Sequence, residues 1–132
     1  MLNPPTILAP VSPGEVLDRL SILELKLAAA RTATARDTVR FAMDALNHAW
    51  TEAIGTSPKS HPAWLELHAI NTALWRIEDE VRAFEKARDF GPAFIKAARS
   101  VYQTNDKRAA QKRRVDEDFG SRLMDLKFHP EE

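Results

Sequence analysis

Polar side chains that could carry chemistry come from three separate segments of the chain. The candidate ligand-binding residues are Glu15, Asp18, Arg19, Lys26, Asn71, Trp75, Glu78, Arg82, Asn105, Asp106, Arg108 and Lys112. The arginine fork binds phosphate or carboxylate groups bidentately. Because every segment contributes at least one cation, the pattern favours recognition of an anionic small molecule, such as a sugar-phosphate, or of a protein partner.

Two charged stripes dominate this set. One follows a central helix at Asn71, Trp75, Glu78, Arg82 and Glu85, and the other follows an earlier helix at Glu15, Arg19 and Lys26. If the two helices pack antiparallel, the stripes face each other with matched signs. Two interpretations stay open, a closed ion-pair network that sets helix register and a solvent-accessible polar pocket that binds a ligand.

The carboxylates also raise the possibility of enzymatic chemistry. Glu15, Asp18, Glu78 and Asp79 converging on Mg²⁺ would suit a nucleotide pyrophosphohydrolase, and a cationic pocket of Arg19, Lys26 and Arg82 would suit a chorismate-type mutase. However, Arg19 and Arg82 would neutralise the acids, and no histidine stands near them at helical metal spacing. Nucleotide-loop and serine-hydrolase motifs are absent. We therefore expect a non-enzymatic module without metal or cofactor.

The amino-acid composition limits the classes of partner that we expect this chain to bind. The chain has 19 basic and 19 acidic residues, balanced within each half, so nothing in its overall charge favours nucleic acid or an anionic membrane. The basic run from Lys107 to Arg114 could bind phosphate groups. Because Asp116, Glu117 and Asp118 follow it, a solvated helix with i,i+4 pairs is the favoured interpretation. There is no cysteine, no long apolar run and no basic leader, which favours a cytoplasmic protein.

The elements that position these residues are helices. Apolar residues at Leu67, Leu74, Val81 and neighbouring positions predict a long helix over about 63–88. Ser12 with Pro13 and Glu15 is a capping box that predicts a helix from residue 13 to about 31. A weak break then precedes a second helix to about residue 54, although one long helix over 13–54 is the alternative. Residues 55–62 form a loop.

The C-terminal third predicts further helix. A helix begins at Pro92, after a glycine suited to the left-handed cap, and Thr104–Asp106 interrupts or re-caps it. Residues 107–119 continue, and a last apolar turn contains Leu123, Met124, Leu126 and Phe128. Residues 1–11 are an extended arm whose Ile7 and Leu8 either cover a groove or fray. The prediction is a single all-α domain over residues 1–132, an antiparallel bundle of four or five helices ending in a tail at 129–132.

A structural role is the third functional alternative. Long amphipathic helices that carry Trp50, Trp64 and Trp75 could leave an apolar seam for a second copy of the chain. A homodimer is therefore possible.

Three ordered motifs resemble an uncharacterised bacterial helical family, a domain of unknown function. They are SPGEVLDRLSILELK over 12–26, LWRIED over 74–79 with Arg82 and Glu85, and VYQTNDKRA over 101–109 with Lys112. The resemblance covers residues 12–127 and implies no established activity, only a loose association with cell-surface polysaccharide pathways. The resemblance is what selects Asn105 and Asp106 as candidate site residues, and it adds Glu24, Asp79, Glu85 and Tyr102 to the polar residues of interest.

Overall fold

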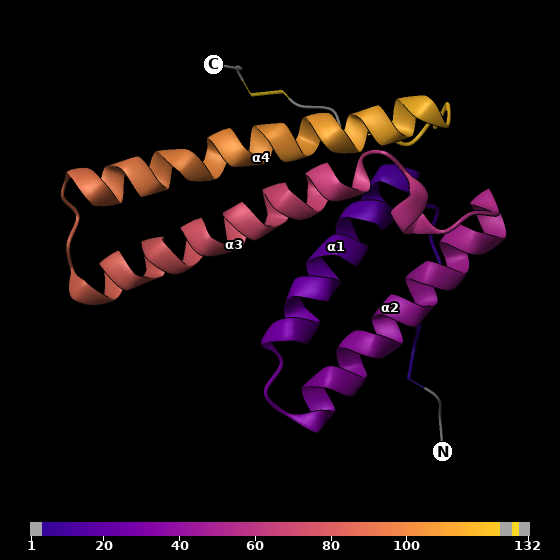
Figure 1. Cartoon of the computed structure of the whole chain (residues 1–132), viewed down its shortest axis with the longest axis horizontal. Helices are drawn as coiled ribbons and strands as arrows, with labels where there is room; N and C mark the ends of the chain where they lie inside the picture. The colour runs from indigo at the N-terminus through magenta and orange to yellow at the C-terminus, as the bar shows by residue number, and fades with distance from the viewer. Residues whose placement is uncertain (1–3, 125–127, 130–132) are drawn as a thin grey trace.

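The computed structural model describes residues 4–124 and 128–129 and shows an all-α bundle (Figure 1). Its helices are α1 (Pro13–Ala29), α2 (Ala33–Ile54), α3 (Trp64–Ala87) and α4 (Pro92–Asp118), with a short 3₁₀ turn, η1 (Pro58–Ser60). The described residues contain four α-helices and no strand.

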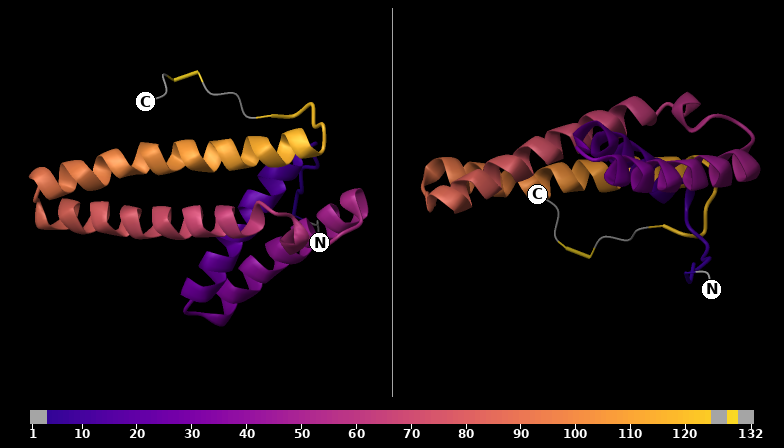
Figure 2. Two further views of the ribbon diagram at one scale, coloured as in Figure 1. Left: turned by 45° about the horizontal axis from the view of Figure 1, so that its top comes forward. Right: turned by 90° about the horizontal axis from the view of Figure 1, so that it is seen from below.

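The helices form two antiparallel hairpins that cross. The α1–α2 hairpin meets the α3–α4 hairpin near the start of α1, and the connected end of the α3–α4 hairpin projects well beyond the crossing (Figures 1 and 2). The largest fully buried apolar side chains, Leu17, Leu67 and Val115, come from α1, α3 and α4. The core therefore sits at the crossing.

Local sequence signals account for the first helix boundaries. The Ser12 hydroxyl accepts a hydrogen bond from the Glu15 amide at 3.2 Å, and Pro13 opens α1, as the capping motif predicts. Thr32 caps α2 in the same way through the Ala35 amide at 3.1 Å. Residues 13–54 thus form two helices.

The other end of the chain corrects several expectations. Helix α4 runs unbroken through Thr104–Asp106, because its packing along α3 outweighs the weak helix propensity of those residues. Arg88, with φ 55°, takes the left-handed cap expected of Gly91, which is the extended N-cap of α4. Leu123, Met124 and Phe128 lie outside any helix, and Leu126 lies outside the described residues.

The structure decides between two pairs of alternatives for apolar side chains. Ile7 and Leu8 in the extended arm are 91% and 92% exposed, so they cover no groove. Trp50 and Trp64 are buried in the core and form no exposed seam, whereas Trp75 is half-buried.

Candidate functional site

A fully buried carboxylate, Asp18, joins three helices at the crossing. Its oxygens accept hydrogen bonds from Arg108 Nε at 2.9 and 3.1 Å and from Arg108 Nη2 at 2.5 Å. Asn71 Nδ2 donates to the same carboxylate at 2.9 Å. The charge of Asp18 is therefore matched by a guanidinium and an amide, as a buried carboxylate requires.

Ser21 completes this cluster on α1. Its hydroxyl donates to the Asp18 carbonyl at 3.0 Å and accepts from Asn71 Nδ2 at 2.6 Å. Asn71 thus uses its amide nitrogen to hold both α1 residues. The cluster of Asp18, Ser21, Asn71 and Arg108 fixes the register of α1 against α3 and α4, and we call it the Asp18 cluster.

A second set of polar contacts fastens the first turn of α1 to α4. The buried Asp116 carboxylate accepts a hydrogen bond from the Gly14 amide at 2.7 Å. The helices approach so closely here that a Cβ on Gly14 would overlap the Lys112 carbonyl oxygen. Glycine is therefore required by the helix packing rather than by its own backbone angles.

Glu15 extends this contact to the protein surface. One of its oxygens lies 2.7 Å from Lys112 Nζ and the other 3.0 Å from Arg19 Nε. Burial raises the pKa of Glu15, but the hydrogen bonds and positive charges of Lys112 and then Arg19 outweigh it, so the net pKa lies below its ordinary value of 4.5. Glu15 is thus held ionised.

The predicted facing of the two charged stripes is wrong. Helix α1 crosses α3 at Asn71 instead of running along it. Glu78, Arg82 and Glu85 therefore lie exposed on the projecting part of α3, and within the described residues no ion pair joins them to α1.

The structure sorts the predicted site residues into two groups. It joins Glu15, Asp18, Arg19, Asn71, Arg108 and Lys112 in the polar contacts described above. Of the others, Lys26, Glu78 and Arg82 are exposed, while Trp75, Asn105 and Asp106 are half-buried.

Sequence reasoning missed three residues of the contact region. Ser21 lacked any signal, and Gly14 was read only as part of a cap. Asp116, like Lys112, was assigned to a solvated helix face, yet they are only 2% and 8% exposed. The charge alternation around them also occurs on solvated helices, so the pattern alone could not separate the two cases.

The residues needed for the enzymatic alternatives do not converge. Asp18 is committed to Arg108, while Glu78 and Asp79 are exposed on the projecting part of α3. Arg82 stands on that same part, apart from Arg19 and Lys26. Over residues 4–124 and 128–129 no group of three side chains is arranged to hold a metal ion.

In that same part of the chain no helix has the length and apolar character to cross a membrane.

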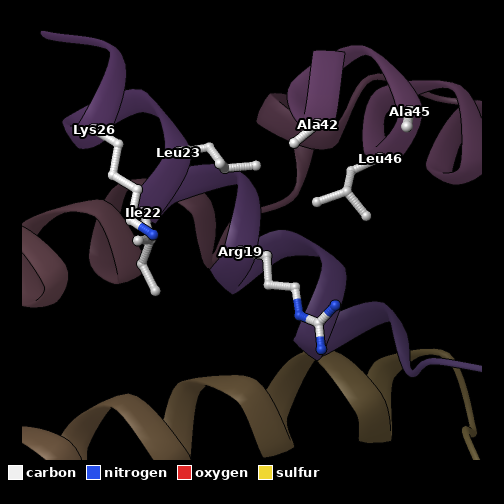
Figure 3. A pocket seen from close by; sticks show the side chains of 7 residues that line it. All are labelled: Arg19, Ile22, Leu23, Lys26, Ala42, Ala45 and Leu46. Atoms are coloured by element: carbon white, nitrogen blue, oxygen red, sulfur yellow. The ribbon is translucent and has the colours of Figure 1, made fainter. Parts of the chain in front are cut away.

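An open groove lies between α1 and α2 (Figure 3). Its volume is about 450 Å³, and it is lined by Arg19, Ile22, Leu23, Lys26, Ala42, Ala45 and Leu46. The Arg19 side chain remains 54% exposed despite its contact with Glu15. Lys26 is exposed and has no ion pair with any described residue. The α1–α2 groove thus combines an apolar floor with two cations.

Comparison of the chain with protein-family models, with curated proteins and with solved structures gives no match. The family suggested by the three sequence motifs therefore stays a prediction.

Proposed function

We propose that this chain is a non-enzymatic binding module that recognises an anionic ligand in the α1–α2 groove. The Asp18 cluster and the contacts of Gly14 and Glu15 serve to hold the helices together. A cytoplasmic location, which the absence of cysteine favours, belongs to this proposal.

One observation carries the proposal: Arg19 and Lys26 line the groove beside an apolar floor, with no acidic residue in the lining. Of the other cationic candidates, Arg108 is bound to Asp18 and Lys112 to Glu15. Recruiting either one for a ligand would break an ion pair that is buried or nearly so, which is costly. Lys26 has no ion pair with any described residue, and the Arg19–Glu15 pair lies at the surface, where an ion pair contributes little.

The groove also limits the chemistry of the ligand. Residues 19 and 26 are seven positions apart, so their Cα atoms are about 10 Å apart along the helix axis. An extended ligand with two anionic groups about that far apart and an apolar body would match both positions and the apolar floor between them. Nucleotide sugars, sugar bisphosphates and acidic peptides are the classes to test.

A thermal-shift screen with these three classes tests the proposal. A ligand at about 100 times its Kd stabilises the native state by about 2.7 kcal/mol and raises Tm by several degrees. We expect R19Q/K26Q to lose the shift and R40Q to retain it, because Arg40 is exposed on a face of α2 away from the groove. Equal shifts in the native chain, R19Q/K26Q and R40Q would contradict the proposal. So would the absence of any shift of Tm with an anionic ligand at millimolar concentration.

A further inference from the structure

The projecting part of α3 carries an acidic flank that this chain leaves uncovered. Beyond the crossing with α1 at Asn71, the spacing of four, three, four and three residues places Trp75, Glu78, Arg82 and Glu85 on the same side of α3. The last three are exposed and Trp75 is half-buried. Two acids and one arginine give this flank a net negative charge.

The spacing of the acids matches the spacing of the groove cations. Glu78 and Glu85 are seven residues apart on α3, and Arg19 and Lys26 are seven residues apart on α1. Seven residues are nearly two turns, so each pair lies along one side of its helix with the same axial separation of about 10 Å. A helix laid along α1 can therefore oppose both cations with both acids at once, in either direction.

The fold prevents one chain from making this match internally. Asn71 and Arg108 hold α1 across the hairpin at Asp18, and within the described residues no ion pair joins Arg19 or Lys26 to the acids of this flank. Both surfaces stay open in the same chain. Two copies related by a two-fold axis can satisfy both, because each supplies one groove and one flank to the other.

We propose that the acidic partner of the α1–α2 groove is the Glu78–Glu85 flank of α3 from a second copy of this chain, forming a closed two-fold dimer. The inference rests on the proposed function, since it uses the same groove. Its basis is charge complementarity at matched heptad spacing.

The groove lining suits a helix as occupant. Ala42 and Ala45 on α2 are small enough to let another backbone approach, and Ile22, Leu23 and Leu46 supply apolar surface. On the incoming helix, Trp75 and Val81 are half-buried in the single chain and have surface left to cover. The stem of Arg82, between the two acids, can lie over the apolar floor. This is helix-in-groove recognition.

Sedimentation velocity of charge-reversal variants tests the dimer. We expect the native chain to dimerise reversibly, and we expect R19E/K26E and E78K/E85K each to weaken dimerisation at least about tenfold. All four positions are on exposed surface, so circular dichroism should show intact folds. R40E/R99E and E66K/E80K are the matched controls, because each reverses two charges of the same sign at exposed positions outside both surfaces.

Mixing the two variants gives the decisive result. An equimolar mixture of R19E/K26E and E78K/E85K restores opposite charges at both contacts of a heterodimer, so we expect the mixture to dimerise although neither variant does so alone. A native chain that is monomeric at high micromolar concentration would overturn the inference. The inference would also be overturned if neither variant weakened dimerisation, if the mixture stayed monomeric, or if the native chain formed oligomers of more than two copies.

The thermal-shift result separates this inference from the proposed function. A monomeric native chain whose ligand-induced shift depends on Arg19 and Lys26 rejects the dimer and leaves the groove as a binding site. A charge-dependent dimer without any ligand shift supports the second copy as occupant and rejects a separate anionic ligand.

Discussion

Replacing Asp18 with asparagine tests whether the Asp18 cluster holds the fold together. The substitution preserves side-chain size but removes the negative charge that faces Arg108. It also places an amide group, in part a hydrogen-bond donor, against the donors of Arg108 and Asn71. The hydrogen bond between Asn71 and Ser21 can persist.

The burial of the partners sets the magnitude. Asp18 is fully buried and the Arg108 side chain is 28% exposed, so solvent can only partly replace the lost carboxylate. Removing one partner of a buried pair costs about 3–5 kcal/mol. Because Arg108 is partly solvated, we expect the lower part of that range, about 3 kcal/mol, for D18N.

Urea unfolding followed by circular dichroism measures this loss as a lower midpoint at constant slope. D79N is the matched control, since Asp79 is an exposed acid on α3 and its loss should change stability by less than about 0.5 kcal/mol. A double-mutant cycle of D18N with R108M should give a coupling energy of about 2 kcal/mol.

A D18N protein as stable as the native chain would refute this reasoning. It would mean that the Asp18–Arg108 pair contributes no net stability and that its role lies elsewhere. A loss of ligand-induced shift in D18N without a loss of stability would move the binding site from the α1–α2 groove to the Asp18 cluster.

Two further predictions concern the first turn of α1. G14A should lower the free energy of unfolding by about 2–4 kcal/mol, which is measured as a lower Tm. The added methyl group would overlap the Lys112 carbonyl oxygen, push α1 away from α4 and break the hydrogen bond between the Gly14 amide and Asp116. A stabilised G14A, as helix propensity alone would give, contradicts the close packing. Because the folded-state pKa of Glu15 is lowered, its ionised form stabilises the fold above about pH 4.5, and this contribution is lost as the pH falls through the folded pKa. E15Q should therefore be less stable than the native chain at pH 7, and the difference should shrink below pH 4.5; a constant difference would contradict this linkage.

Much of the fold follows from local patterns. The apolar spacing from Leu67 to Phe84 predicts α3 within a residue or two of its observed bounds, and the caps at Ser12 and Gly55 mark where α1 begins and α2 ends. Helix periodicity and capping depend on residues within a turn or two of each other, so a sequence contains this information directly.

The candidate site could be predicted only in part. Glu15, Asp18, Asn71 and Arg108 stand out as polar residues beside apolar stripes, and they do meet. Lys26 belongs to the same polar pattern but does not meet these residues. It lines the groove between α1 and α2, and most of the other residues in that lining are apolar and cannot be predicted from a polar pattern.

The sequence by itself determined α1, α2 and α3, their order and the apolar side that each of them buries. Only the tertiary structure decided which helix covers which side. Periodicity reports that a face is buried but not what buries it. The crossing of α1 over the α3–α4 hairpin depends on the close approach to α4 that Gly14 allows and on the bonds of Asp18 to Asn71 and Arg108. The crossing pairs Asp18 with Arg108 inside the Asp18 cluster. It leaves the cations of the α1–α2 groove and the acids of α3 exposed.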